Sequence, residues 1–326
     1  MNEAEAVAKY WRAMPMGKTP DGETPVVLGI DCGGTHLRVG LIDSSGEILS
    51  VEVVDTQKTL DGKDAIKPLA SFLSGFLDRN LSQSYRLSAI SAGFPSLIDQ
   101  NRRKIIQTTF IEGLQNVDVV KGLSQFKVPV FIDRDVNFLL KYDSVRFELP
   151  KCGAWVGCYI GTGLGCALAF DGKIMVGKHG VAGELGHVPG GTGIRCGCGN
   201  MGCLESKTAG HALVEMLKEH YGEDEPIGEV FVRHGDEPFV DEWLEYLARA
   251  FATAINLLDP QCVLVGGGIP QMKGFPKQKL EEKIRVMARK PVPASDLELT
   301  YTTVAPMDGV LGGAMVAFEQ LALDGQ

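Results

Sequence analysis

One pattern limits the possible folds of this chain more than any other: strand, glycine turn, strand, turn and strand occur in that order twice. The pattern covers residues 26–54 and returns at 154–176. In both places apolar residues alternate with small or polar ones on either side of the glycines, which is typical of hairpins in a sheet. A repeated supersecondary unit indicates related domains. We therefore expect an α/β protein with two domains, each of which presents one glycine turn.

Further strands and helices follow each repeat. Short apolar runs predict buried strands at 89–94, 128–132 and 262–265. Helical spacing of apolar residues predicts helices over 62–80, 207–220, 237–258 and 309–322, with another helical run starting at Phe138. Strands that alternate with helices indicate sheets covered by helices.

The expected domain organisation has three parts. They are an N-terminal extension over 1–25, a small α/β domain over 26–135 together with 306–326, and a large α/β domain over 136–305 that carries a structural zinc site. Within the extension, Val7, Tyr10, Trp11 and Met14 fall at helical spacing. We expect them to form a short amphipathic helix that packs on the body of the protein.

Composition and charge limit which binding partners and which cellular compartment we expect for this chain. A formal net charge of −9 argues against general binding to nucleic acid or to anionic membranes. The uncharged segment 152–170 is interrupted by five glycines, so we interpret it as two strands and a turn and not as a membrane helix. Because the first residues form no apolar leader, we expect a cytoplasmic protein. Its eight cysteines are then free thiols or metal ligands and not a disulfide framework.

The two glycine turns are candidate phosphate-binding loops. Backbone N–H groups without a neighbouring Cβ can approach phosphate oxygens closely, and a threonine adds a hydroxyl. The residues are Asp31, Gly33, Gly34 and Thr35 in the first turn, and Gly161, Thr162 and Gly163 in the second. Asp31 could hold Mg²⁺ directly or through water. The pair of turns favours a nucleoside triphosphate as ligand, although each turn alone could be an ordinary hairpin.

A cluster of cysteines predicts a metal site. Cys196, Cys198 and Cys203 lie within eight residues of sequence, and His187 precedes them by nine. Three thiolates and one imidazole form a tetrahedral zinc site that has no open position for water, so the zinc would be structural. The alternatives are free thiols or a disulfide.

Three carboxylates could serve the chemistry of a bound substrate. Asp135 follows a buried strand, where ligands bind in α/β sheets, and could act as a general base. It could equally be the N-cap of the next helix, as could Asn137. Glu184 and Glu205 flank the expected zinc ligands, which would hold them close together to bind sugar hydroxyls. Alternatively, both glutamates are solvated surface residues.

Four motifs together resemble those of the ROK family (repressors, open reading frames and sugar kinases). They are Asp31-Cys32-Gly33-Gly34-Thr35, Gly161-Thr162-Gly163-Leu164-Gly165, Glu184-Leu185-Gly186-His187, and the spaced Cys, Gly and Glu residues from Cys196 to Glu205. The resemblance runs from about residue 26 to the C-terminus. It implies the two-domain, actin-like ATPase fold (ribonuclease H-like), with ATP and sugar in the interdomain cleft.

Within the family, the chain is most similar to D-allose kinases, in the stretches 134–137, 180–187 and 252–260. The resemblance implies that Asp135 is the catalytic base. It also implies sugar contacts for Glu184, His187 and Glu205, with His187 also on zinc. The glycine turns would bind phosphates, and the loop of Gly266, Gly267 and Gly268 would lie on the adenosine side. We also expect Gly93, at the end of the strand over 89–94, to contact substrate.

One residue departs from the family pattern. Glucokinase-type members have Asn immediately before the catalytic Asp, where this chain has Arg134. A longer, charged donor in the sugar pocket should change which hydroxyl stereochemistry is accepted, which agrees with the resemblance to D-allose kinases.

These observations predict an ATP-dependent enzyme that makes a hexose 6-phosphate. We expect D-allose as the favoured hexose, with ATP, Mg²⁺ and structural Zn²⁺ as cofactors; the family makes a homodimer plausible. The alternatives are a kinase for glucose, fructose or N-acetylmannosamine, or a non-catalytic sugar-binding regulator. Regulators of this family carry a helix-turn-helix domain ahead of the sugar module, and about 25 residues before the first strand are too few for one.

Overall fold

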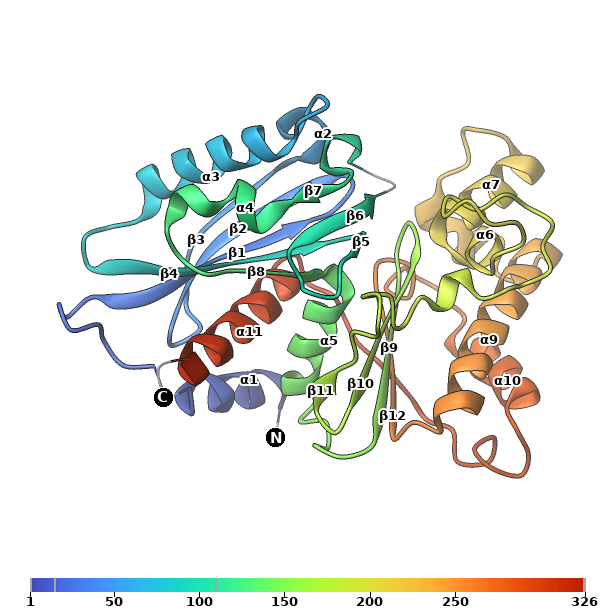
Figure 1. Ribbon diagram of the computed structural model, residues 1–326. Helices are drawn as coiled ribbons and strands as arrows, with labels where there is room; N and C mark the ends of the chain where they lie inside the picture. The colour runs from blue at the N-terminus through green and yellow to red at the C-terminus, as the bar shows by residue number, and fades with distance from the viewer. Residues whose placement is uncertain (1, 15, 109–110, 325–326) are drawn as a thin grey trace. The chain divides into compact units, whose positions relative to one another are not determined.

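The computed structural model describes residues 2–14, 16–108 and 111–324. The chain divides into two compact units, each assembled from segments distant in sequence (Figure 1). The first unit consists of Met1–Leu149, Val176–Ala182 and Ala305–Gln326. The second consists of Pro150–Met175 and Gly183–Val304.

A five-stranded sheet forms the centre of the first unit, in the order β3-β2-β1-β4-β8. The strands are β1 (Thr24–Cys32), β2 (His36–Asp43), β3 (Ile48–Asp55), β4 (Tyr85–Phe94) and β8 (Val130–Arg134). The first three form an antiparallel meander, which confirms the expected strand, turn and strand pattern. β4 and β8 then run parallel to β1, so the carboxyl ends of three strands meet at one edge of the sheet.

Helices cover both faces of this sheet (Figure 1). Val26, Leu28 and Ile30 of β1 belong to the same apolar core as α3 (Ile66–Asn80). Val27 instead faces α11 (Asp308–Asp324), as the alternation of side chains along a strand requires. Helix α5 (Asp135–Arg146) packs against α11 and β4. The first unit therefore extends past Asp135 to Leu149, beyond the boundary expected from sequence.

The N-terminal residues form the expected amphipathic helix, α1 (Glu3–Arg12). Trp11 is buried and meets the ring of Phe318 edge-on, with the ring centroids 5.8 Å apart. Glu3 pairs with the buried Arg146 of α5 at 2.8 Å. The prediction that this segment packs on the body of the protein is confirmed.

A small antiparallel sheet follows β4, and the sequence did not predict it. It contains β5 (Ser96–Ile98), β6 (Lys104–Thr108) and β7 (Val117–Asp118), in that order. Each strand is too short for alternation of apolar and polar residues to be recognised. Two four-residue helices, α2 (Thr56–Thr59) and α4 (Val119–Gly122), complete the first unit.

The second unit repeats the same strand order, β11-β10-β9-β12-β13. The strands are β9 (Ala154–Ile160), β10 (Leu164–Phe170), β11 (Lys173–Ile174), β12 (Cys262–Gly266) and β13 (Leu299–Tyr301). β9, β10 and β11 are antiparallel neighbours, and β12 runs parallel to β9. The prediction of a structural repeat is confirmed strand by strand.

Helices of the second unit enclose its own apolar core, in which Trp243 and Phe251 are fully buried. They are α6 (Glu205–Thr208), α7 (Gly210–Tyr221), α8 (Val230–Arg233), α9 (Pro238–Leu258) and α10 (Lys277–Met287). The expected single helix over 207–220 is broken at Ala209, whose backbone is extended. None of the helices in the described ranges combines the length and apolar character needed to cross a bilayer.

Candidate functional site

The candidate catalytic residues of the first unit lie where three parallel strands end. Asp31 of β1 is in register with Gly93 of β4, and Gly93 is in register with Asp133 of β8. Asp135 follows two residues after Asp133, as the first residue of α5. The carboxyl ends of strands are where open α/β sheets bind ligands. The sheet thus brings together carboxylates that are more than one hundred residues apart in sequence.

Gly93 lets the start of α5 approach the sheet. A Cβ at this position would lie 3.1 Å from the ring of Phe138 and 3.3 Å from the Cα of Asp135. Both contacts are tighter than ordinary van der Waals packing. Gly93 therefore has a packing role beside Asp135, which is separate from the substrate contact expected for it.

The charges of Asp31 and Asp135 interact. Burial, and then the neighbouring negative charge of Asp135, raise the pKa of Asp31 from an ordinary value of 3.8 to about 6. The guanidinium of Arg38 opposes this shift, because its Nη1 lies 3.0 Å from the Oδ2 of Asp31. Two carboxylates that repel each other in a buried place attract a cation, so they suit a metal-bound phosphate ligand.

Asp135 is not the N-cap of α5. The N-cap position belongs to Arg134, which makes no side-chain cap hydrogen bond. The Oδ1 of Asp135 accepts the N–H of Val136 at 2.8 Å. Asn137 does not cap the helix either, since its side-chain amide donates to Asp133 at 2.6 Å.

Arg134 is buried, with only 6% of its surface exposed. Its Nη1 donates to the carbonyl oxygen of Ala182 at 2.7 Å. The guanidinium therefore holds the segment Val176–Ala182, which ends two residues before Glu184 in the chain. The sequence analysis treated Arg134 only as a donor toward sugar, and this backbone contact is an additional role.

The first glycine turn has its carbonyl oxygens tied to α2. The hydroxyl of Thr56 donates to the Gly33 oxygen at 2.7 Å, and its N–H donates to the Thr35 oxygen at 2.9 Å. The side chain of Gln57 donates to the Gly34 oxygen at 2.8 Å. Within the turn, the N–H of Gly33 already bonds to a carbonyl oxygen. The amides of Gly34 and Thr35 are therefore the better candidates for phosphate.

The second glycine turn is built in the same way, on a different helix. The Gly161 oxygen accepts the N–H of Gly210 at 2.9 Å, at the start of α7. The Thr162 oxygen accepts both the N–H of His211, at 3.1 Å, and its ring Nδ1, at 3.0 Å. The N–H of Gly161 is occupied by the Gly163 oxygen. Thr162 and Gly163 thus correspond to Gly34 and Thr35 in the first turn.

The third glycine loop, Gly266 to Gly268, follows β12. Gly267 has φ +98°, and a Cβ there would overlap the carbonyl oxygen of Ile160. Gly268 is exposed and has open space around it. Gln271 closes the loop by donating to the Gly267 oxygen at 2.9 Å. Only the middle glycine is thus required both for its conformation and for close approach.

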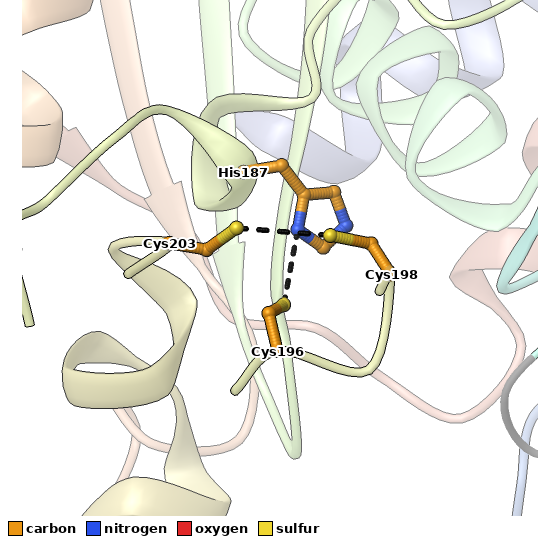
Figure 2. A group of neighbouring side chains, drawn as sticks. All are labelled: His187, Cys196, Cys198 and Cys203. Carbon is orange, nitrogen blue, oxygen red and sulfur yellow. Dashed lines mark hydrogen bonds between the residues drawn. The ribbon is translucent and has the colours of Figure 1, made fainter. Parts of the chain in front are cut away.

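The four expected metal ligands converge (Figure 2). One ligand atom from each of His187, Cys196, Cys198 and Cys203 lies within 4.8 Å of all the others. The Cys198 and Cys203 sulfurs are 3.7 Å apart, and the Cys196 sulfur is 3.5 Å from the His187 Nδ1. In a tetrahedral zinc site, bonds of about 2.3 Å to sulfur and about 2.0 Å to nitrogen give edges of about 3.8 and 3.5 Å. The residues fit zinc.

The carboxylates that flank this cluster have different partners. Glu184 Oε2 lies 3.5 Å from the Nε2 of His187, so the imidazole has one nitrogen toward the cysteines and one toward a carboxylate. Such an arrangement fixes the tautomer of a metal-bound histidine. Glu205 begins α6, and its Oε2 accepts the N–H of Leu164 at 3.1 Å. Glu205 is therefore tied to the second glycine turn and is not a freely solvated surface residue.

Comparison with known proteins decides the family. The model of the ROK family matches residues 27–320. The chain belongs to the ROK family. It is 27% identical over 299 residues to the DNA-binding transcriptional dual regulator NagC of Escherichia coli (strain K12), covering 83% of this chain and 72% of that protein. It is 29% identical over 271 residues to a glucokinase of Streptomyces coelicolor, covering 75% of this chain and 82% of that one.

A solved ROK structure supports the fold. The ROK hexokinase from Thermus thermophilus matches with a TM-score of 0.74 and 26% identity, over 91% of this chain and 99% of that chain. The expected two-domain, actin-like α/β fold is thus confirmed.

Sequence reasoning missed several residues of this ROK site. Arg38 holds Asp31 through an ion pair, and Thr56 and His211 each hold a glycine turn through two hydrogen bonds. None of them belongs to a motif, because their roles depend on which strands and helices become neighbours. Asp133 was overlooked for a different reason. It lies two residues before Asp135 in the same short segment, and the sequence alone does not show which of the two carboxylates is the better candidate base.

Proposed function

We propose that this ROK protein is an ATP-dependent phosphotransferase that makes a hexose 6-phosphate, with D-allose as the favoured sugar. Family membership and the similarity to a glucokinase support the general class. The observation that carries the proposal is the pair of interacting carboxylates, Asp31 and Asp135, at the carboxyl ends of β1 and β8.

In the proposed reaction, the C6 hydroxyl of the sugar attacks the γ-phosphate of ATP in line. Asp135 accepts the proton of that hydroxyl as the bond to phosphorus forms, and ADP leaves. The amides of Gly34, Thr35, Thr162 and Gly163 donate hydrogen bonds to phosphate oxygens. Because the carbonyls of both turns are already bonded to helices, they do not repel the phosphates.

Two metals belong to the proposal. Asp31, near Asp135, would hold Mg²⁺ directly or through water, and Mg²⁺ neutralises charge on the transferred phosphoryl group. His187 and the three cysteines would hold Zn²⁺, which links the segment around Glu184 to the start of α6. The zinc ligands would thereby orient Glu184, His187 and Glu205 as the proposed sugar contacts.

The proposed preference for D-allose rests on local sequence similarity and on Arg134. In glucokinase-type members an Asn at this position touches the sugar. Here a buried guanidinium takes its place and holds the Ala182 carbonyl. A longer donor that is fixed at one end changes the shape and polarity available to the sugar ring. Glucose, fructose and N-acetylmannosamine are the alternative substrates.

The test is ADP release from Mg-ATP with a panel of hexoses. We expect turnover with D-allose that exceeds turnover with glucose, fructose and N-acetylmannosamine. A preference for glucose would contradict the argument from Arg134.

Asp135→Asn keeps the shape of the side chain and removes the base, so kcat should fall by about 10²–10⁴-fold while the sugar still binds. Calorimetric titration of the variant with sugar provides the control for folding and binding. Near-normal turnover in the variant would remove Asp135 from the mechanism.

A second candidate function is a non-catalytic, sugar-responsive regulator. The similarity to NagC over 83% of this chain favours it. A regulator of this kind would bind a sugar without releasing ADP. Binding by calorimetry combined with no sugar-dependent ADP release for any hexose of the panel would establish this function over the kinase.

A further inference from the structure

The carboxylate of Asp133 organises the turn from β8 into α5. Its Oδ1 accepts the N–H of Arg134 at 2.7 Å and the side-chain amide of Asn137 at 2.6 Å. These two bonds span the first turn of α5, and Asp135 lies between them in sequence. The backbone position of Asp135 therefore depends on where the Asp133 carboxylate is held.

Arg102 supplies the opposite charge. Its Nη2 lies 3.2 Å from the Oδ1 of Asp133, and the two side chains are only 17% and 18% exposed. All three guanidinium nitrogens of Arg102 are buried, and within the described part of the chain none has a hydrogen-bond partner of good geometry. The negative charge of Asp133 is the largest favourable influence on this buried guanidinium, and Asp99 adds a smaller one. The ion pair thus connects the β5–β6 hairpin to the end of β8.

The hairpin loop holds Arg102 in place. Arg102 has φ +51°, in the left-handed region, and its N–H donates to the Asp99 carbonyl oxygen at 3.0 Å. The side chain of Asp99 accepts the next two N–H groups, of Arg103 at 2.7 Å and of Lys104 at 2.9 Å. A loop closed by three hydrogen bonds to one aspartate directs Arg102 to one side. Its neighbour Arg103 instead has a side chain that is 50% exposed and pairs weakly with Asp118 at 3.5 Å.

We propose that Arg102 is a positioning residue for Asp135, acting through the carboxylate of Asp133. The inference rests on the proposed kinase function and extends it to a residue outside the motifs of the family. In this arrangement, the β5–β6 hairpin places the guanidinium of Arg102 next to Asp133, in the turn that leads to Asp135.

The charge of Arg102 is needed because Asp133 is buried. Burial raises the pKa of Asp133, and the positive charge of Arg102 is the largest influence that opposes this. Arg134 and Asn137 add smaller stabilising contributions to the charged form. Without Arg102, the carboxylate would either take up a proton or turn toward water. Either change weakens its bonds to the first turn of α5 and moves Asp135.

The experiment compares Arg102→Met with Arg103→Met, a matched change at the adjacent residue. In Arg102→Met we expect kcat to fall by about 10–100-fold, because a small displacement of a catalytic group is costly. The KM values for ATP and for the sugar should change by less than about threefold, since Arg102 touches neither ligand. Arg103→Met should retain the wild-type kcat. Equal loss in both variants, or an increase in KM with kcat unchanged, would overturn the inference.

Two further variants test whether Arg102 acts through Asp133. Arg102→Lys keeps the charge and should recover part of kcat. Arg102→Met combined with Asp133→Asn removes the negative charge that Arg102 compensated, so kcat should exceed that of Arg102→Met alone. Independent, multiplicative losses in the double variant would show that Arg102 acts by another route.

Hydrogen exchange separates failure of this inference from failure of the proposed function. Arg102→Met should speed amide exchange over residues 133–138, and Arg103→Met should not. If the wild type releases no ADP with any hexose, the kinase proposal fails while the exchange result still reports on the turn. If the wild type is active and Arg102→Met is unchanged in kcat and exchange, the kinase proposal stands and the positioning role is wrong.

Discussion

Asp31 shows how a single residue can connect the sheet to the proposed chemistry. The end of β1 places its carboxylate beside Gly93 and near Asp135, where burial and like charge oppose ionisation. Arg38 lies seven residues later, on the neighbouring strand β2, and its positive charge partly offsets this by favouring the ionised form of Asp31. The charge of the pair therefore changes within the range of pH in which enzymes are assayed.

The pH profile of the proposed kinase should report this pair. With a pKa of about 6, Asp31 is charged above pH 6 and gains a proton below it. Since its proposed role with Mg²⁺ needs the negative form, kcat/KM should fall about tenfold for each pH unit below the midpoint. Arg38→Met removes the charge that lowers this pKa, so the midpoint should move to higher pH. A steady-state profile from pH 5 to 9 measures both.

A matched control uses Arg79→Met. Arg79 pairs with Glu52 on the exposed side of the same unit, at 2.7 Å. This variant should keep the wild-type midpoint. A flat wild-type profile between pH 5 and 7, or a midpoint that moves to lower pH in Arg38→Met, would contradict the assignment to Asp31.

Residues that carry chemistry in a short motif could be predicted, and their partners could not. The sequence predicted the convergence of His187, Cys196, Cys198 and Cys203, because a metal site in one short loop depends on local spacing. It also made Asp135 a candidate base, because a buried strand precedes that residue, but left the N-cap of the next helix as an alternative. The ion pair of Arg102 with Asp133 depends on how a hairpin packs against a strand some thirty residues later. Spacing along the chain contains no such information.

At the scale of elements, the same glycine-rich sequence serves different purposes at neighbouring positions. In the loop after β12, Gly267 needs its left-handed backbone and its lack of a Cβ, while Gly268 has neither constraint. The sequence analysis assigned all three glycines of this loop to adenosine binding. The structure gives a folding reason for Gly267 that is independent of any ligand.

This difference predicts unequal effects of two alanine substitutions. Gly267→Ala should lower the free energy of unfolding by about 1–3 kcal/mol, because Ala at φ +98° is strained and its Cβ overlaps the Ile160 carbonyl. Gly268→Ala should change stability by less than about 0.5 kcal/mol. Urea unfolding followed by circular dichroism compares them. Equal stability of the two variants would mean that the loop relaxes freely around residue 267.

Long elements with clear periodicity were predicted, and most of the elements that were missed are short. The strands of both repeats and helix α9 match their expected ranges closely, since many residues contribute to each pattern. The three strands of the small sheet, with two to five residues each, were not predicted. Helix α10 was also missed, because polar residues fill most of its surface and only Leu280 and Ile284 are buried. Short elements depend on tertiary contacts for their existence.

At the scale of the whole molecule, the repeat found in the sequence became two sheets with one strand order. In both meanders a glycine turn joins the first two strands, and its carbonyls bond to a helix, α2 in one unit and α7 in the other. The helices are unrelated in length, so the common feature is the need to satisfy those carbonyls. Each unit also has its own apolar core, so we expect each to unfold as a separate cooperative unit.

Because the metal ligands all belong to the second unit, removal of zinc should destabilise that unit selectively. We expect one zinc per chain by elemental analysis, and loss of the metal in Cys198→Ser. The variant should unfold about 5–10 °C lower, with faster hydrogen exchange over residues 185–217, because the metal binds only the folded loop. Exchange over the strands of the first unit should stay unchanged, since their core contains no residue of the cluster.

Cys152→Ser, at an exposed cysteine outside the cluster, is the matched control and should keep both zinc and stability. Equal zinc content in the two variants would refute the metal assignment. Faster exchange in both units would show instead that the two cores unfold as one.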